Sequence, residues 1–343
     1  MRRDRYRVAQ WGTGHTGTRS LRNVIEHPRY DLVGVRVYSD AKVGRDAGDL
    51  CGVPSTGVIA TSAIEDIVAA APDCVLYMPL LDHESIDDLC ELLGAGVNVV
   101  TTVPRFFHPP TMDSTVRDRL EEACGRGDAS LYGTGPGPGF ITEDLPLTLL
   151  KLQRRLDRLS IVQFADLSER RSPEFLAQTF GFDPADAARS RPATHLGLAD
   201  GAGLRQVADI IGMPLDEVTR SVAWAVATKT VEIGVGTIEA GTIGAWQIQV
   251  TGLRDGKPFL EFRRTLYVTR DLDPAFEIRD ATWHVIVEGD APLDIEVRFA
   301  KENYGPISPG YNAHIAVNAV PAVCDATPGI RTTDELLILP IFR

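Results

Sequence analysis

The stretch of sequence that decides the fold is Val8-Ala-Gln-Trp-Gly12-Thr-Gly14-His-Thr-Gly17, where a Gly-x-Gly-x-x-Gly turn follows directly after an apolar run. In such a turn the first glycine permits a tight bend, the second lets the backbone approach the phosphates of a dinucleotide, and the third lets the next helix lie close to its strand. The amides at the start of that helix attract an anion. The turn therefore predicts a pyrophosphate site, provided that a strand precedes it and a helix follows. Its residues are Gly12, Thr13, Gly14, His15, Thr16 and Gly17.

The segments around this turn supply the strand and the helix that it requires. Leu21, Val24 and Ile25 lie at helical spacing, and His27-Pro28 ends that helix. A second apolar strand at 32–38 follows at the interval of a βαβ unit. Further strands and amphipathic helices alternate at 73–78, 85–93, 97–102, 116–124 and 129–132. Such alternation implies a parallel sheet, so residues 1–140 are predicted to form a Rossmann dinucleotide-binding domain of the α/β class.

After residue 141 the pattern becomes rich in strands. Helices are expected at 143–157, 203–211 and 214–219, and strands at 159–166, 228–233, 242–253, 259–268, 283–287 and 294–299. The strands alternate apolar and polar residues, as in a mostly antiparallel sheet with one solvated face, and Asp255-Gly256 signals a hairpin. Residues 141–312 are therefore predicted to form an α+β domain. Residues 313–343 begin with an alanine-rich helix at 313–324 and are expected to return to the first domain.

Composition argues against several kinds of partner. The 343 residues carry 35 basic and 47 acidic side chains, a formal charge of −12, and nucleic-acid binding needs a basic face. No apolar run approaches the ~20 residues that span a bilayer, and the N-terminus lacks a signal-like apolar core. We therefore expect no nucleic acid, no membrane and a cytoplasmic location. Five cysteines and seven histidines form no ligand pattern, so no metal is expected either.

The residues after the second strand bear on the choice of cofactor. An acid at this point binds a free ribose diol, whereas small polar and basic side chains accept the 2′-phosphate of NADP. Ser39, Lys42 and Arg45 favour NADP, while Asp40 leaves NAD open. Lys42 and Arg45 are also compatible with a simple solvated loop.

Two later strands end in segments that fit a nicotinamide site. Met78-Pro79 and Thr101-Thr102 lie at predicted carboxyl ends, where cofactor and substrate would meet in a doubly wound sheet. On spacing alone they are equally compatible with ordinary strand ends.

Several longer segments carry a resemblance to a known family. With the glycine turn, they resemble the dihydrodipicolinate-reductase-like oxidoreductases, which include 2,4-diaminopentanoate dehydrogenase and the native amine dehydrogenases. The resemblance covers nearly the whole length. It implies a Rossmann domain, an α+β substrate and dimerisation domain, a homodimer, and NAD(P)H-dependent imine reduction. The segments are 43–48, 74–79, 98–102, 133–140, 238–242, 287–290 and 318–324.

The chain departs from this family where its amine-forming members carry a glutamate that handles the proton from ammonia. That glutamate follows the strand corresponding to 97–102, but here Val103-Pro-Arg-Phe-Phe-His108 follows, with no acid before Asp113. Gly137 also replaces the polar residue expected before Pro138. Condensing ammonia with a carbonyl near neutral pH needs a group that cycles a proton. A carbonyl reductase that never uses ammonia is therefore the alternative.

Three side chains are candidate proton donors. His195 lies about where relatives place an active-site histidine, and imidazole titrates near neutral pH, although it is also compatible with a structural role. Glu169 follows the strand 159–166 but also belongs to a charged run. His108 replaces the missing acid, although Pro109-Pro110 after it indicates a rigid exposed loop.

Five residues are candidates for the substrate pocket, which in most enzymes is apolar with a few polar groups. For the aromatic ones, ordinary core packing is the competing interpretation. The candidates are Phe140, Phe164, Asp166, Ser168 and Trp246.

The sequence thus predicts an NAD(P)H-dependent oxidoreductase that reduces a C=N or C=O bond of a small carbonyl, imine or amine substrate. A sensor that binds NADP after losing its catalytic groups remains open, because nucleotide binding does not prove turnover. The open antiparallel sheet favours a homodimer, since such a sheet must cover one face.

Overall fold

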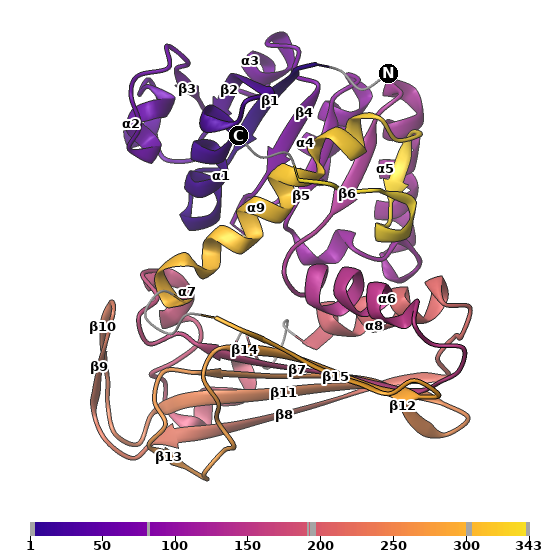
Figure 1. Cartoon of the computed structure of the whole chain (residues 1–343). Helices are drawn as coiled ribbons and strands as arrows, with labels where there is room; N and C mark the ends of the chain where they lie inside the picture. Colours follow the sequence, from indigo (N-terminus) through magenta and orange to yellow (C-terminus); the bar gives the residue numbers. More distant parts are fainter. Residues whose placement is uncertain (1–3, 81–82, 191, 193–196, 300–303, 341–343) are drawn as a thin grey trace. The chain divides into compact units, whose positions relative to one another are not determined.

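The computed structural model describes residues 4–80, 83–190, 192, 197–299 and 304–340, and the chain divides into two compact units (Figure 1). Unit 1 comprises Met1–Gly139 and Pro309–Arg343, and unit 2 comprises Phe140–Ser308. The C-terminal segment therefore completes the unit that the N-terminal segment begins. Among the described helices, none has both the length and the apolar character needed to cross a bilayer.

Unit 1 is built on a parallel sheet of seven strands in the order β16-β6-β5-β4-β1-β2-β3. The chain runs outward from β1 to β3 and then returns to the other side of β1 with β4. In open α/β sheets, ligands bind beyond the carboxyl ends of the strands at this reversal point. The strands are β1 (Tyr6–Trp11), β2 (Tyr30–Arg36), β3 (Ala60–Thr61), β4 (Cys74–Tyr77), β5 (Asn98–Thr101), β6 (Ser130–Gly133) and β16 (Gly329–Arg331).

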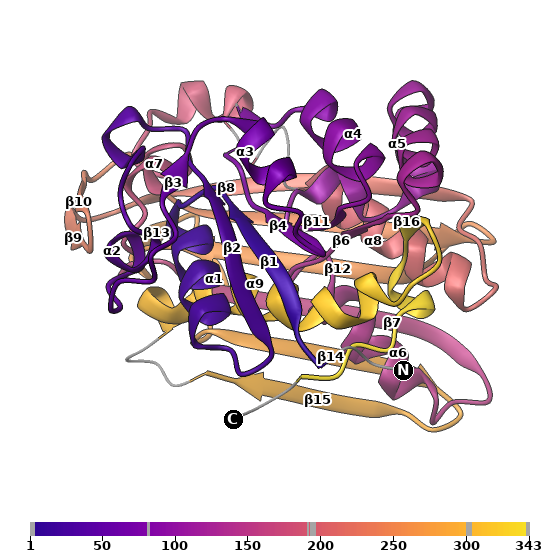
Figure 2. The same cartoon turned by 90° about the horizontal axis from the view of Figure 1, so that it is seen from above.

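Helices cover both faces of this sheet, as Figure 2 shows. On one face, apolar side chains of α3, α4 and α5 pack against Val75 and Tyr77 of β4. On the other face, α1 and α9 pack against Cys74 and Leu76 of the same strand. Because successive strand residues point to opposite faces, the continuous apolar run of β4 is buried on both sides. The helices are α1 (His15–Glu26), α2 (Ala47–Cys51), α3 (Ile64–Ala69), α4 (Ile86–Gly94), α5 (Ser114–Gly127) and α9 (Tyr304–Cys324).

Unit 2 is built on a second sheet of seven strands in the order β13-β8-β11-β12-β7-β14-β15. Only β7 and β12 pair in parallel, so the prediction of a mostly antiparallel sheet is confirmed. A separate hairpin is formed by β9 (Val231–Ile233) and β10 (Gly236–Ile238). The strands of the sheet are β7 (Leu156–Asp166), β8 (Glu217–Ala227), β11 (Ile243–Arg254), β12 (Lys257–Tyr267), β13 (Leu272–Asp273), β14 (Thr282–Gly289) and β15 (Leu293–Arg298).

The helices of unit 2 are α6 (Leu145–Leu150), α7 (Pro173–Ala177) and α8 (Gly197–Ile210). Leu204, Val207 and Ala208 of α8 join the core on one face of the sheet. The predicted Asp255-Gly256 hairpin joins β11 to β12, with φ of 51° and 70° at its two residues. These positive values are the ones that a two-residue turn between antiparallel strands requires.

Two expected helices are wrong in extent or type. The helix expected at 143–157 ends early, because a π-helical turn at Phe140–Asp144 leads into α6, which ends at Leu150. Beyond it, the amides of Arg154 and Arg155 donate to the Asp290 carboxylate, at 3.1 and 2.9 Å, and β7 begins at Leu156. Residues 217–219 of the helix expected at 214–219 belong to β8, where they pair with β11. In both cases tertiary pairing outweighs a weak local preference.

The other differences are shifts of element ends. The strand expected at 228–233 is confined to Val231–Ile233, and the helix expected at 313–324 begins earlier, at Tyr304. The other five expected strands of unit 2 are found within three residues of their expected ends, as β7, β11, β12, β14 and β15, whereas β8, β10 and β13 were not among the expected strands. Element ends are the least certain part of any sequence-based assignment.

Candidate functional site

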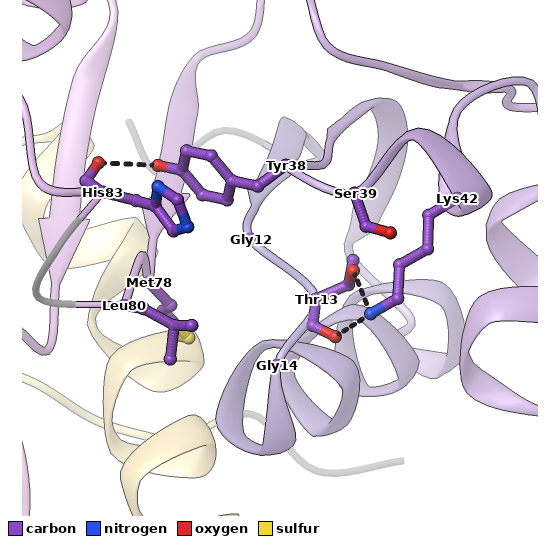
Figure 3. Close-up of a pocket in the computed structure, with 9 residues that line it drawn as sticks. All are labelled: Gly12, Thr13, Gly14, Tyr38, Ser39, Lys42, Met78, Leu80 and His83. Atoms are coloured by element: carbon purple, nitrogen blue, oxygen red, sulfur yellow. Dashed lines mark hydrogen bonds between the residues drawn. The ribbon is translucent and has the colours of Figure 1, made fainter. Parts of the chain in front are cut away.

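A hollow of about 270 Å³ lies at the reversal point of the unit 1 sheet (Figure 3). Its walls come from the segments that follow β1, β2 and β4, which is where a doubly wound sheet binds its ligand. The lining residues are Gly12, Thr13, Gly14, Tyr38, Ser39, Lys42, Met78, Leu80 and His83. We call this hollow the dinucleotide pocket.

The glycine turn is shaped by steric need at two positions. Gly12 has a φ of +87°, and a Cβ there would lie 2.5 Å from the carbonyl oxygen of Met78. A Cβ at Gly17 would lie 2.1 Å from the carbonyl oxygen of Gly12, so glycine lets α1 approach the turn closely. Neither position accepts a side chain without moving the backbone.

Gly14 is different, because a Cβ there would meet nothing within 4 Å. Its missing side chain leaves open space in the pocket rather than relieving a clash inside the protein. Gly14 is also the residue that precedes α1, and no side chain caps this helix end in the described structure. The start of α1 and the open backbone at Gly14 together suit the pyrophosphate of a dinucleotide.

Lys42, at the end of the short helix η1 (Asp40–Lys42), reaches the glycine turn (Figure 3). Its Nζ donates to the carbonyl oxygen of Thr13 at 2.8 Å and to Thr13 Oγ1 at 3.2 Å. The hydroxyl of Thr18 donates to the same carbonyl oxygen at 3.1 Å. The ammonium group is therefore close to the turn and still lines the pocket.

An aromatic pair forms the opposite wall. The rings of Tyr38 and His83 are stacked, with centroids 4.4 Å apart and planes inclined by 15°. The Tyr38 hydroxyl accepts a hydrogen bond from Trp11 Nε1 at 2.8 Å and donates one to the carbonyl oxygen of His83 at 3.1 Å. Burial raises the pKa of Tyr38, which keeps this hydroxyl protonated.

This aromatic wall and Leu80 were not among the residues expected from the sequence to bind the cofactor. Tyr38 follows β2 and His83 follows β4. These two strands are the neighbours of β1 on either side, so both residues lie at the reversal point of the sheet. An aromatic residue just beyond such a strand was the signal that could have identified them.

The guanidinium of Arg36, the last residue of β2, lies behind this wall. Its central carbon is 4.1 Å from the centroid of the Tyr38 ring and 4.5 Å from that of the Trp11 ring. Such stacking is favourable for a weakly hydrated cation. A positive charge is thus fixed beside the pocket in addition to that of Lys42.

Six of the residues expected to bind the cofactor line the pocket, and seven do not. Arg45, for example, lies outside the pocket and is exposed to solvent. Thr101 also lies outside it; its side chain is buried, and its Oγ1 accepts a hydrogen bond from the amide of Val103 at 3.1 Å. The six are Gly12, Thr13, Gly14, Ser39, Lys42 and Met78; the seven are His15, Thr16, Gly17, Arg45, Pro79, Thr101 and Thr102.

An acid approaches the end of β5 from a neighbouring loop. Arg105, in the helix η3 (Pro104–Phe106) that follows β5, forms an ion pair with Glu84, which follows β4. The Glu84 side chain is only 8% exposed, and burial raises its pKa while the guanidinium of Arg105 lowers it. The sequence segment after β5 contains no acid, but the tertiary structure supplies one there.

The expectation that His108 lies in an exposed loop is wrong. His108 is only 4% exposed, between buried Phe107 and the helix η4 (Pro109–Thr111), and its Nδ1 lies 3.2 Å from Thr111 Oγ1. The two prolines form the start of this helix, where a missing amide costs nothing.

The candidate pocket residues of unit 2 do not form one wall. Phe164 and Trp246 lie on strands of the same sheet but point to opposite faces. Phe164 packs with Tyr267, whereas Trp246 shares a face with Ile248 and donates from Nε1 to the carbonyl oxygen of Thr179 at 2.6 Å. A single pocket can therefore include at most one of these rings.

The remaining candidates of unit 2 make local contacts. Asp166 Oδ1 accepts the amide of Ser168 at 3.0 Å and its hydroxyl at 2.6 Å, which closes a tight turn after β7. Phe140 packs against Trp283 with ring centroids 5.8 Å apart, and Glu169 is exposed. His195 lies outside the described residues.

A buried charged pair lies between α8 and the unit 2 sheet. Arg264 donates to Asp200 Oδ1 at 3.1 Å and to Gln163 Oε1 at 2.8 Å, and Asp200 is fully buried. Burial raises the pKa of Asp200 to about 6, although the guanidinium lowers it. A buried pair of this kind is weak evidence for stability, because desolvating two charges offsets their attraction.

Comparison with known proteins gives a family match over most of unit 2 and the C-terminal segment of unit 1. The sequence model described as the 2,4-diaminopentanoate dehydrogenase C-terminal domain matches residues 145–342. A curated protein named "Amine dehydrogenase" from Streptomyces virginiae is 28% identical over 356 residues, covering 96% of each chain.

Solved structures resemble the fold over nearly the whole length. The amine dehydrogenase of Mycobacterium smegmatis matches with a TM-score of 0.82 at 19% identity, covering 98% of this chain and 97% of that one. Biliverdin reductase from Synechocystis sp. PCC 6803, solved with biliverdin and NADP+, matches with a TM-score of 0.51 at 12% identity, covering 93% and 90%. At these identities the likeness concerns the fold, and it confirms the α/β class with a second, mixed-sheet domain.

Proposed function

This chain belongs to the 2,4-diaminopentanoate dehydrogenase family, and from that premise we propose that it uses NADPH to reduce a C=N bond of a small substrate. Members of this dihydrodipicolinate-reductase-like group are NAD(P)-dependent oxidoreductases that act on small molecules. This chain is an NAD(P)-dependent oxidoreductase as well. The observation that carries the proposal is the dinucleotide pocket, with open backbone at Gly14 and the start of α1, which no side chain caps in the described structure, beside it.

The residues of the pocket fit a nicotinamide dinucleotide. The turn at Gly12–Gly14 would hold the pyrophosphate, because its open backbone and the start of α1 offer amides to an anion. Met78 and Leu80, after β4, add an apolar wall. When bound, the nicotinamide supplies the hydride, and the protein has to orient it, hold the substrate and deliver a proton.

Preference for NADP is supported by the segment after β2. Ser39 and Lys42 line the pocket, and Arg36 places a second cation behind its wall. Asp40 is exposed and does not line the pocket. A small hydroxyl and a basic side chain at this point suit a 2′-phosphate better than a free diol.

The proton donor is proposed among three side chains. His195 is our first choice on the resemblance, and Glu169 and His108 follow. The buried His108 keeps Thr111 as a partner, and the exposed Glu169 is better suited to exchange protons with solvent. The substrate contacts that we propose are Phe140, Asp166, Ser168 and one of the two aromatic residues Phe164 and Trp246.

The name of the Streptomyces virginiae relative supports amine chemistry, so the main test uses ammonia. Oxidation of NADPH is followed with a panel of small ketones and aldehydes, with and without ammonium. Turnover that requires ammonium, with an amine as product, supports C=N reduction. Turnover unchanged by ammonium identifies a carbonyl reductase, and nucleotide binding without turnover on any substrate identifies the sensor alternative.

A homodimer is proposed to form through the unit 2 sheet. The face opposite α8 carries partly exposed polar residues such as Gln247, Gln249 and Arg263. An open sheet face of this kind is suited to a second copy of the chain. Light scattering after gel filtration should give about twice the 37.3 kDa of one chain, and the mass of one chain would contradict the dimer.

A further inference from the structure

We propose that Lys42 orients the peptide between Thr13 and Gly14, so that the Gly14 amide faces the phosphates of the bound dinucleotide. The inference rests on the proposed cofactor site and adds a positioning role for this lysine. That role is separate from reading a 2′-phosphate.

The starting observation is that one carbonyl oxygen receives two side-chain donors. The Thr13 carbonyl accepts Lys42 Nζ at 2.8 Å and Thr18 Oγ1 at 3.1 Å (Figure 3 draws the lysine contact). A hydrogen bond from a charged donor is about twice as strong as one between neutral groups. The carbonyl of Thr13 is therefore fixed toward Lys42 and Thr18.

Fixing this carbonyl also fixes the amide of the next residue. The Thr13–Gly14 peptide is trans, since the cis peptides among the described residues are those before Pro138 and Pro274. In a trans peptide the C=O and N–H groups point in opposite directions. The Gly14 amide therefore points away from the two donors, and it finds no acceptor among the described residues.

The chemistry of the turn explains why such a lock is needed. Glycine at position 14 offers little steric resistance to rotation of this peptide. A rotated peptide would present the negative end of the carbonyl to the phosphates and would remove one donor from the site. The lysine ammonium prevents this, and it also polarises the peptide so that the Gly14 amide becomes a better donor.

This role differs in a measurable way from recognition of the 2′-phosphate. A lysine that reads only that phosphate contributes to NADPH binding and not to NADH binding. A lysine that orients the turn contributes to both, because both cofactors carry the same pyrophosphate. The ratio of the two affinities therefore separates the roles.

The experiment measures dissociation constants for NADH and NADPH by fluorescence titration of the full chain. The variants are Lys42→Met, Lys42→Arg and Thr18→Val, with Lys257→Met, an exposed lysine of unit 2, as the matched control. Lys42→Met should weaken both cofactors about ten- to hundredfold, the effect of losing a charged hydrogen bond. Lys42→Arg should recover most of this, Thr18→Val should weaken both less, and the control should change neither.

A second readout needs no cofactor. With 15N-labelled glycine, the amide signal of Gly14 in the free protein should shift in Lys42→Met and stay near its original position in Lys42→Arg. Thermal melting identifies a variant that has failed to fold, in which case Lys42→Arg and Thr18→Val carry the test.

Three results would overturn the inference. They are a loss confined to NADPH, unchanged affinity for both cofactors, or a general loss with no shift of the Gly14 amide. If the unmodified chain binds neither nucleotide, the proposed function fails and the inference fails with it. The two failures are distinguishable. If only the inference fails, the unmodified chain still binds a nucleotide, whereas if the proposed function fails, it binds neither NADH nor NADPH.

Discussion

The indole Nε1 of Trp11 lies 2.8 Å from the hydroxyl oxygen of Tyr38, which joins the ends of the neighbouring strands β1 and β2. The same hydroxyl donates to the carbonyl oxygen of His83, beyond β4. One hydroxyl therefore connects the three chain segments that surround the dinucleotide pocket. The position of the aromatic wall depends on this group.

Tyr38→Phe should keep the aromatic ring and remove the hydrogen bonds of the hydroxyl with Trp11 and with the carbonyl oxygen of His83. The indole of Trp11 would lose its acceptor, at a cost of about 1 to 2 kcal/mol in the free energy of unfolding. NADPH affinity should fall only a few fold, whereas Tyr38→Leu, which also removes the stacked ring, should lower it further. Urea unfolding and fluorescence titration measure the two effects. Equal affinities for both variants would show that the ring does not contribute.

The glycine turn offers a matched pair of substitutions. Gly14→Ala should leave the melting temperature nearly unchanged but weaken both cofactors, because its Cβ would enter open space in the pocket. Gly17→Ala should lower the melting temperature, because its Cβ would lie 2.1 Å from the Gly12 carbonyl oxygen. Calorimetry with and without NADPH distinguishes them. Normal cofactor binding by Gly14→Ala would contradict the assignment of this backbone to the pyrophosphate.

Asp46 should stabilise the loop before β3 in a pH-dependent way. Its carboxylate accepts the amides of Thr56, Gly48 and Gly57, at 3.0, 2.7 and 2.8 Å, and these bonds lower its pKa to about 2. A depressed pKa stabilises the fold above the unfolded-state value near 4, and this contribution is lost as the pH falls through about 2. Asp46→Asn should thus be less stable than the unmodified chain at neutral pH, with a gap that narrows in acid. A gap in urea midpoint that stays constant down to pH 3 would refute this.

Asp144 should have the opposite dependence. Burial raises its pKa to about 6, so the folded state binds a proton more tightly than the unfolded state does. Stability should therefore fall as the pH rises from about 4 to about 6. Asp144→Asn should be more stable at pH 7.5 by up to about 3 kcal/mol, with the advantage vanishing below pH 4. Asp255→Asn, in the exposed hairpin, is the control and should show no such trend.

The Glu84–Arg105 pair can be tested by removing each partner. Arg105→Met leaves a buried carboxylate without its guanidinium, so the pKa of Glu84 should rise further. The free energy of unfolding at pH 7.5 should fall by about 1 kcal/mol, since half-exposed Arg105 is screened by water. Because a protonated Glu84 needs no cation, the loss should shrink at pH 5. Adding Glu84→Gln to Arg105→Met should restore stability at pH 7.5, and failure to do so would show that the loss arises elsewhere.

Much of unit 1 could be predicted because its signals are local. The apolar run before Gly12, the helix that ends at His27-Pro28 and the next strand follow each other closely, and each has its own periodicity. Unit 2 was predicted less well. The segment 217–219 becomes a strand because β11 pairs with it, and residues 154–155 are not helical because Asp290 binds the amides of Arg154 and Arg155. Partners that lie 30 or more residues away in the sequence do not change the local hydrophobic pattern from which a helix or strand is predicted.

The sequence by itself determined the class of fold, the position of the nucleotide turn and the family. Glycine spacing and apolar periodicity are properties of short segments, and family segments keep their order along the chain. Only the tertiary structure decided which side chains meet. It brought Tyr38 against His83 and Lys42 onto Thr13, paired Glu84 with Arg105, buried His108 and set Phe164 and Trp246 on opposite faces of one sheet. These contacts depend on strand order and on the loops at the sheet edge, which bring together residues that are distant in the chain.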